Sequence, residues 1–246
     1  MIKLIDTIKN IWNIEDLRNR ILTTLGILAI YRLGSFVVIP GVDPSQLSAL
    51  QDQTSDGLLG LLNMFTGGAF SQASIFALGI MPYISATIIL QLMTPIIPRL
   101  SRLSREEGGR VKIMQIGRVM TLFLCLGQGY VMSLGWLNPG TVLQGFEGSL
   151  ADGGIGYHMQ TMMALTCGTM LVMWLGEQIT ERGIGNGISL IIFAGIVAGT
   201  PAAIFQSMDL MGTGELSVLV MLFLMVFMTA VVGAIVFTEG GQRRIS

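Results

Sequence analysis

The sequence predicts an all-α, polytopic membrane helix bundle with six transmembrane helices and one short re-entrant helix. Of the 246 residues, 52% are hydrophobic and 12% are charged, and the mean hydropathy is +0.70. A soluble domain carries about 25% charged residues. The charged residues are also clustered, and the gaps between the clusters are long enough for spans, which need roughly 20 apolar residues each.

The first 40 residues predict an amphipathic helix followed by a span. In residues 1–20, the apolar residues of one helical face are Ile2, Ile5, Ile8 and Trp12. This pattern favours an interfacial helix on the membrane, with packing against the protein's own loops as the alternative. Residues 21–40 form the first span. Arg32 lies inside it, and because an arginine at mid-span costs roughly 2.5 to 3.5 kcal/mol, we expect its side chain to face the bundle in a structural role.

The uncharged run 57–98 is too long for one span and poorly placed for two. It begins within an external loop, 41–73, whose second part reads GLLGLLNMFTGGAF at 57–70 and is interrupted by glycines. Non-helical backbone at membrane depth is tolerated only inside protein or beside a water-filled cavity. We therefore expect a short helix that folds back into the bundle, with an interfacial loop outside the membrane as the alternative.

Residues 74–97 form the second predicted span, around which the others are organised. Gly79 and Pro82 lie near its middle, where an ordinary span would be smoother. Its neutral polar side chains are Ser85, Thr87 and Gln91. Because an unpaired polar group is costly in lipid, these side chains are expected to face other helices or water. This span is therefore predicted to line an internal feature of the bundle.

The rest of the chain alternates further spans with loops. The predicted elements are a basic loop at 98–112, a third span at 113–137, an external loop to Tyr157, a fourth span at 158–176, a short charged turn at 177–183, a fifth span at 184–205 broken at Pro201, a sixth span at 216–238 and a tail at 239–246.

The distribution of charge predicts the orientation of these spans. With the N-terminus in the cytoplasm, thirteen of the fourteen lysines and arginines fall on the cytoplasmic side, and Arg32 lies in the first span. The external loops then carry no base and seven acids, which are Asp43, Asp52, Asp56, Glu147, Asp152, Asp209 and Glu215. Cytoplasmic loops are enriched in Lys and Arg, so a cytoplasmic N-terminus is predicted.

The residues give little support for enzyme, metal or cofactor chemistry. Cys125 and Cys167 are far apart within predicted spans and match no metal or redox spacing, so both are expected to be small buried hydrophobes. The single histidine, His158, lies near a span end, and the chain has no HExxH motif and no paired intramembrane acids. We expect no catalytic residues, no metal, no cofactor and no DNA partner. A secondary transporter with broken helices stays open as an alternative, although Arg32 is its only charged mid-membrane candidate.

Three segments carry a resemblance to a known family. They are SIFALGIMPYISATIILQ at 74–91, WLGEQITERGIGNGISLII at 174–192 and EGGQRR at 239–244. The first two resemble the two signatures of the SecY family, the channel subunit of the protein translocase, and the third resembles the cytoplasmic end of its sixth span. The resemblance covers essentially the whole chain and the first six of the family's ten spans. It implies the N-terminal half and the first following span of the SecY clamshell. Gly240 stands where the family often has Arg.

The resemblance implies a pore whose waist is closed by a ring of apolar residues. Carried over by position, the ring residues are Ile80, Ile84, Ile188 and Ile192. A narrow apolar collar resists wetting and ion leak. The re-entrant segment corresponds to the family's plug, at about 57–72. The plug residues are Gly57, Leu58, Leu59, Gly60, Leu61, Leu62, Asn63, Met64, Phe65, Thr66, Gly67, Gly68, Ala69 and Phe70.

The resemblance further implies a lateral gate, cytoplasmic contacts and partners. Ser85, Thr87 and Gln91 lie on one side of the gate. The implied cytoplasmic contacts are Arg99, Arg102, Arg105, Arg243 and Arg244. The implied partners are the SecE and SecG subunits, the SecA motor, the ribosome, signal sequences, nascent polypeptides and membrane lipid. The implied function is to pass unfolded secretory polypeptides across the bacterial inner membrane and to release membrane segments into it. Without the family's later spans, the chain alone is not expected to form a closed conducting channel.

Overall fold

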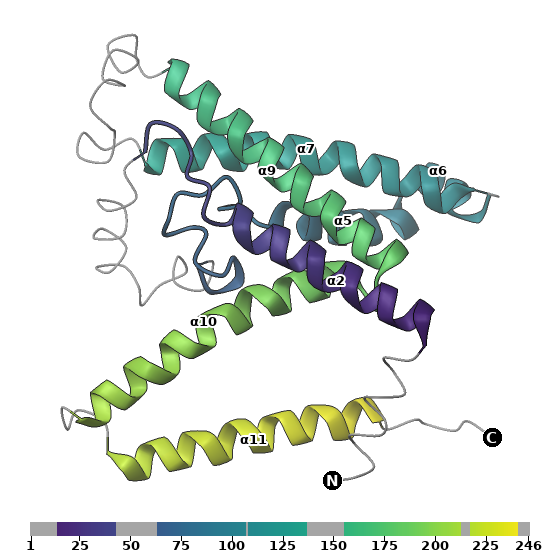
Figure 1. Cartoon of the computed structure of the whole chain (residues 1–246). Coiled ribbons are helices and arrows are strands. Elements are labelled where there is room, and N and C mark those ends of the chain that lie inside the picture. Colours follow the sequence, from purple (N-terminus) through teal and green to yellow (C-terminus); the bar gives the residue numbers. More distant parts are fainter. Residues whose placement is uncertain (1–13, 43–62, 107, 137–154, 213–216, 241–246) are drawn as a thin grey trace, which may run out of the picture. The chain divides into compact units, whose positions relative to one another are not determined.

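The fold is helical throughout the part of the chain that the structure describes. The structure, a computed structural model, describes residues 14–42, 63–106, 108–136, 155–212 and 217–240. Within these ranges the regular elements are helices, and an isolated antiparallel β-bridge joins Val38 to Ser74 (Figure 1). The all-α prediction is confirmed. The chain divides into two compact units, residues 1–199 and residues 200–246.

Helix α2 (Glu15–Gly34) begins before the predicted first span and ends short of its far boundary. Glu15 and Asp16 lie in its first turn, where carboxylates interact favourably with the positive end of the helix dipole. Of the amphipathic helix predicted at 1–20, residues 1–13 lie outside the described residues, and the rest belongs to α2.

Helix α5 (Met81–Ile96) is shorter than the predicted span 74–97, because residues 74–80 are not helical. Pro82 stands in the first turn of α5, where its missing N–H costs nothing. Deeper inside a helix the proline ring would clash with the carbonyl four residues earlier, so the helix does not extend back past this point. Gly79, with φ of +53°, reverses the chain just before the helix begins.

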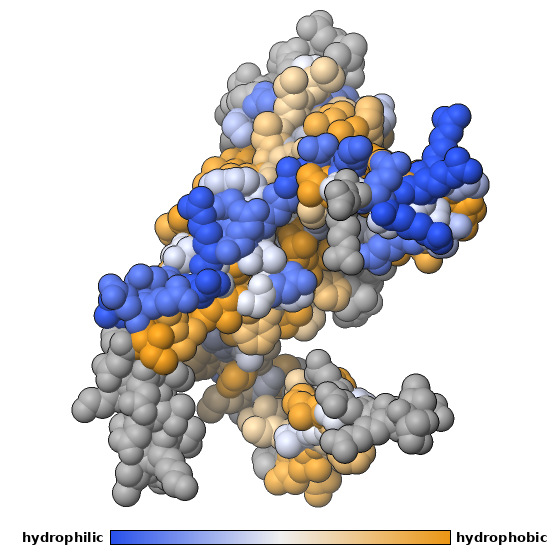
Figure 2. Space-filling view, turned by 90° about the vertical axis from the view of Figure 1, so that its right-hand side faces the viewer, coloured by the Kyte–Doolittle hydropathy of each residue, from blue (hydrophilic) through white to orange (hydrophobic). Residues whose placement is uncertain are grey.

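Helix α6 (Pro98–Arg105) is bent by 99° from α5. Ile97, which precedes Pro98, has extended backbone angles, as a residue before proline prefers. The segment predicted as a basic loop at 98–112 is therefore helical over α6. Figure 2 looks onto the end of the first unit that carries α6 and the start of α2, and hydrophilic residues gather there.

Helices α7 (Gly109–Gly135) and α9 (Ile155–Arg182) pack along each other in the first unit (Figure 1). Their backbones approach closely at Gly129, where an added Cβ would lie 3.3 Å from the Cα of Met162. The charged turn predicted at 177–183 is instead the last part of α9. Glu, Gln and Arg are good helix formers, so the helix continues through these residues and ends at Arg182, just before Gly183.

Helix α10 (Gly187–Gly212) runs through Pro201, where the sequence predicted a break. Proline is tolerated within apolar helices of this kind when the freed backbone groups find other partners. The second unit, residues 200–246, contains the end of α10 and helix α11 (Val218–Gly240). Within α11, the rings of Phe223 and Phe227 stack with centroids 6.3 Å apart.

Three helices are by themselves long and apolar enough to cross a membrane. Within the described residues, they cover Gly156–Arg182, Gly187–Gly212 and Leu219–Thr238. The bent pair α5 and α6 provides a fourth candidate if it is counted as one broken span. The helices at the first and third predicted spans, α2 and α7, do not meet this criterion. The six-span topology therefore stays a prediction.

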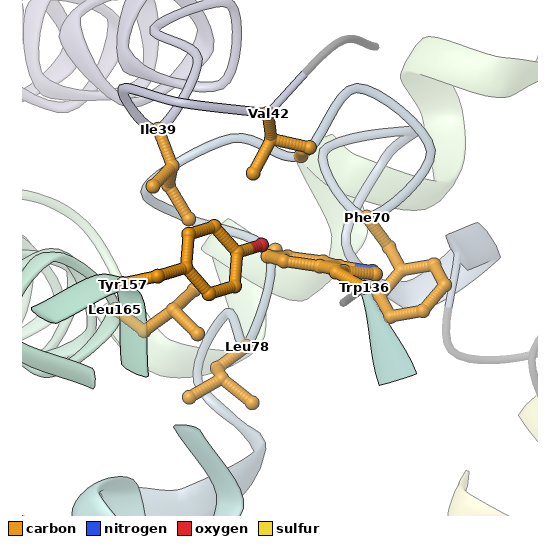
Figure 3. Close-up of a cluster of buried hydrophobic side chains, with 9 residues drawn as sticks. Ile39, Val42, Phe70, Leu78, Trp136, Tyr157 and Leu165 are labelled. Carbon is orange, nitrogen blue, oxygen red and sulfur yellow. The ribbon is translucent and has the colours of Figure 1, made fainter. Parts of the chain in front are cut away.

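The buried side chains of the first unit form two clusters. The outer cluster consists of Ile39, Val42, Phe70, Ala73, Ala77, Leu78, Trp136, Tyr157 and Leu165. Figure 3 shows Tyr157 and Trp136 side by side at its centre, with Phe70 beyond them. The rings of Phe70 and Trp136 have centroids 6.0 Å apart and are tilted by 50°. The second cluster, called the central cluster, contains Tyr31, Ala69, Phe76, Ile80, Val172, Leu175, Ile179 and Ile191, and partly buried residues of α2, α5 and α10 pack against it.

Candidate functional site

The inner segment, residues 63–80, packs within the first unit and connects to the start of α5. Its second half pairs with the chain that follows α2. The Ile39 N–H donates to the Ala73 carbonyl at 2.9 Å, and the Ile75 N–H donates to the Val37 carbonyl at 3.0 Å. Two backbone bonds in this antiparallel arrangement fix one end of the inner segment to the end of α2.

Two glycines make room for this anchored end. The Phe76 ring stacks on Tyr31 of α2 with centroids 5.8 Å apart and planes 9° apart. A Cβ at Gly34 would overlap the Phe76 ring, and a Cβ at Gly168 of α9 would overlap the Ile75 carbonyl. Any larger residue at either glycine would therefore push the inner segment away from the helices.

The other end of the inner segment is held by Arg32. The Arg32 Nη1 donates to the Gly67 carbonyl at 2.6 Å, and its guanidinium lies 5.1 Å from the centroid of the Phe36 ring. Gly67 has φ of +64°, and an added Cβ there would lie 2.9 Å from the Cα of Gly195 in α10. Arg32 therefore faces a protein partner, as expected of an arginine within a span, but the sequence does not reveal that partner.

The four predicted ring isoleucines meet in one cluster. The buried members of the central cluster are Tyr31, Ala69, Phe76, Ile80, Val172, Leu175, Ile179 and Ile191. Packed against them, and partly buried, are Ile84 of α5 and both Ile188 and Ile192 of α10. Ile80 itself is only 5% exposed. The structure thus brings together side chains more than a hundred residues apart, and their role as a pore ring stays a prediction.

The polar residues assigned to the gate lie around two different cavities beside α5. Ser85 lines a cavity of about 440 Å³ between the inner segment and α7, together with Thr66 and Gln128. Thr87 and Gln91 line a separate cavity of about 260 Å³ between α5 and the start of α7. The three side chains therefore share a helix but not a site.

Two threonine hydroxyls fix the glycine-rich entry to α10. The Thr24 Oγ1 of α2 accepts a hydrogen bond from the Ile184 N–H at 3.1 Å. The Thr180 Oγ1 of α9 accepts one from the Gly187 N–H at 2.9 Å. These threonines were not singled out from the sequence, although a hydroxyl within an apolar helix is a signal for such a contact.

The remaining predicted site residues are only partly described. Residues 57–62 of the plug and Arg243 and Arg244 lie outside the described residues. Arg99, Arg102 and Arg105 are exposed on α6. Cys125 is buried as expected, but Cys167 is exposed, so that expectation was wrong for Cys167, which faces outward from α9. The described part of the chain contains no group of three or more His, Cys, Asp or Glu that could hold a metal ion.

Comparison with known proteins assigns the chain to a family. The sequence model of the SecY family matches residues 74–246. The chain is 48% identical over 231 residues to the protein translocase subunit SecY of Escherichia coli (strain K12), which covers 94% of this chain and 51% of that protein. It is 43% identical over 236 residues to the corresponding Helicobacter pylori subunit, with 94% and 54% covered.

A solved structure shares the fold. Sec61 in the canine ribosome-channel complex from the endoplasmic reticulum superposes with a TM-score of 0.58 and 16% identity, covering 93% of this chain and 49% of that one. The chain thus spans about half the length of the two curated relatives named above. Because the family model matches more than half of the chain, residues 74–246, this chain belongs to the SecY family.

Proposed function

We propose that the chain forms part of a protein-conducting channel. The channel passes unfolded secretory polypeptides across the bacterial inner membrane and releases membrane segments into it. The observation that carries the proposal is the central cluster, where Ile80, just before α5, and Ile84 of α5 meet Ile188 and Ile192 of α10. The similarity to proteins named as translocase subunits supports the same function.

The chemistry of the ring suits a pore that accepts many sequences. Branched aliphatic side chains exclude water and ions from a narrow waist when it is closed. They also yield around a passing chain without forming hydrogen bonds that would select a sequence. The channel itself needs no catalytic residue, and the energy for transport comes from its partners.

Residues 63–72, the first part of the inner segment, are the described part of the proposed plug. Ala69 of this part belongs to the same cluster as Ile80, which supports a plug that packs against the proposed ring. Ser85, Thr87 and Gln91 of α5, which line two separate cavities, would belong to one side of the proposed lateral gate. A signal sequence would enter between α5 and the seventh and eighth spans of the family.

The orientation and partners form a further part of the proposal. The hydrophilic end of the first unit carries the exposed arginines of α6 and the charged first turns of α2, which supports a cytoplasmic location for this end and for the N-terminus (Figure 2). Arg99, Arg102 and Arg105, with Arg243 and Arg244, would contact the SecA motor or the ribosome. SecE and SecG would be the companion subunits.

Site-specific photocrosslinking tests the function. A crosslinker is placed at Ile188, and an arrested secretory chain is supplied both to the 246-residue protein and to a form in which the family's remaining spans are added. The matched control carries the crosslinker at Phe123, which is 68% exposed on α7, away from the central cluster.

The outcomes separate three cases. Crosslinks at Ile188 but not at Phe123, and only with the added spans, mean that this chain is half of the channel. The same pattern in both forms means that the chain assembles into a pore without them. The absence of crosslinks at Ile188 in both forms would contradict the proposal and would favour the alternative of a secondary transporter.

A further inference from the structure

We propose that Arg32 is a positioning residue that latches residues 63–68 of the inner segment in the closed conformation. These residues are called the free end, because they are the end of the segment remote from the backbone pairing at Ala73 and Ile75. The proposal rests on the proposed function only in identifying this segment with a plug. The latch itself is a property of the contacts between α2, the inner segment and α10, and it is tested without transport.

The two ends of the inner segment are held by different kinds of contact. At the anchored end, backbone bonds join Ile39 to Ala73 and Val37 to Ile75, and Phe76 is stacked on Tyr31. At the free end, Arg32 donates to the carbonyl of Gly67 at 2.6 Å. The first set of contacts joins backbone to backbone and ring to ring, whereas the second includes one long side chain that reaches across from α2.

Gly67 lies between Arg32 and α10. A Cβ at Gly67 would lie 3.2 Å from the Arg32 Nη1 and 2.9 Å from the Gly195 Cα. A Cβ at Gly195 would lie 2.8 Å from the Phe65 carbonyl oxygen. The free end is thus clamped between a guanidinium on one side and the bare backbone of a helix on the other.

The position of Arg32 explains why this bond is strong and why it can still be exchanged. A charge inside an apolar bundle must keep a partner, and a hydrogen bond to a charged donor contributes more than a neutral one. The Phe36 ring, 5.1 Å away, gives the guanidinium a second contact on α2 itself. When the free end leaves, an extended polypeptide can offer a carbonyl in place of that of Gly67, because its backbone groups are not bonded internally. The inner segment would then pivot on its anchored end.

Cysteine accessibility tests the latch in the 246-residue chain in membranes. Thr66, next to Gly67, is only 3% exposed and is close to cysteine in size, so Thr66→Cys reports the release of the free end. Cys167→Ala removes the exposed native thiol. The native Cys125, fully buried on α7, stays as the internal reporter of general unfolding. A water-soluble maleimide is added and the labelling rate at each cysteine is measured by mass spectrometry.

In this background Arg32→Met is expected to raise the labelling rate at position 66 by about tenfold or more, the factor that corresponds to about 1.4 kcal/mol. The rate at Cys125 is expected to stay unchanged. Arg32→Lys, which keeps the charge and a donor, is expected to restore part of the protection at position 66.

Two outcomes overturn the latch. One is an unchanged rate at position 66 in Arg32→Met, and the other is a parallel rise at Cys125, which would make Arg32 a general stabiliser of the bundle. If Arg32→Met does not accumulate, Arg32→Gln, which is neutral but retains a donor, is judged by the same two rates. A latch that passes this test while the crosslinks at Ile188 fail would leave the contact established and the channel function rejected.

Discussion

Arg118 of α7 and Glu177 of α9 form a bidentate ion pair. The Arg118 Nε donates to the Glu177 Oε1 at 3.0 Å, and the Nη2 donates to the Oε2 at 2.8 Å. The side chain of Glu177 is 21% exposed and that of Arg118 is 45% exposed. The planar guanidinium matches the carboxylate edge to edge, so the pair fixes the rotation of one helix against the other.

A double-mutant cycle measures what this pair contributes. We expect Arg118→Met and Glu177→Gln to show a coupling of about 0.5 to 1 kcal/mol in unfolding free energy, because Arg118 is half-exposed and water screens the pair. Thermal unfolding in detergent gives the four stabilities. Glu181→Gln, at an exposed position one turn later, is the control and should show no coupling to Arg118→Met. If the losses of unfolding free energy in the two single variants simply add in the double variant, the ion pair does not contribute to stability.

Two glycine-to-alanine changes should have opposite effects on stability. A Cβ at Gly168 would overlap the Ile75 carbonyl, so Gly168→Ala should destabilise the protein by about 1 to 3 kcal/mol, the usual range for overpacking. At Gly26 of α2 no atom lies within 4 Å of an added Cβ, so Gly26→Ala should be neutral or stabilising by up to about 1 kcal/mol. Unfolding midpoints in detergent decide between them, and equal effects would contradict the packing of the inner segment against α9.

Polar substitutions in the proposed ring should make the closed channel leak. We expect Ile80→Asn combined with Ile188→Asn to increase ion conductance across a bilayer, since a polar collar wets more readily than an apolar one. The measurement is a conductance recording on the chain with the family's remaining spans supplied. Ile88→Asn, at a position 50% exposed on α5, is the control and should leave the conductance low. An equal leak from both variants would remove the ring assignment.

The two cysteines should differ in reactivity in the folded protein. Cys167 is exposed on α9 and Cys125 is buried on α7, so a small maleimide in mild detergent should label the first and spare the second. Both should react after denaturation. Fast labelling of Cys125 in the folded state would mean that the α7 and α9 contact is looser than the structure has it.

The sequence predicted the all-α fold because long apolar runs leave few other structures. It predicted the ends of the helices less well, because helix ends depend on single residues. Pro82 together with Gly79 delays the start of α5 to Met81, although residues 74–80 are as apolar as the helix. Conversely, Glu177 and Arg182 looked like a solvated turn, yet α9 includes both, because the charged and polar residues of this stretch are good helix formers.

The site was predictable only where the residues lie in recognisable motifs. The ring isoleucines follow from a resemblance, since isoleucine in an apolar helix carries no signal of its own. The contact of Arg32 with Gly67 joins residues 35 positions apart through a carbonyl, and a carbonyl has no sequence signature. The same holds for the Gly168 contact with the Ile75 carbonyl, where the glycine is visible in the sequence and its reason is not.

The right-angled junction of α5 and α6 limits how α5 can move. Arg99, Arg102 and Arg105 lie on a helix bent by 99° from the end of the span. Sliding α5 along its own axis into the membrane would carry the charged helix α6 into hydrocarbon, and each arginine there costs roughly 2.5 to 3.5 kcal/mol. Rotation or tilting of α5 about its junction with α6 carries no such cost. The bend therefore fixes the depth of α5 in the membrane, so any opening beside α5 occurs by tilting of that helix rather than by translation along its axis.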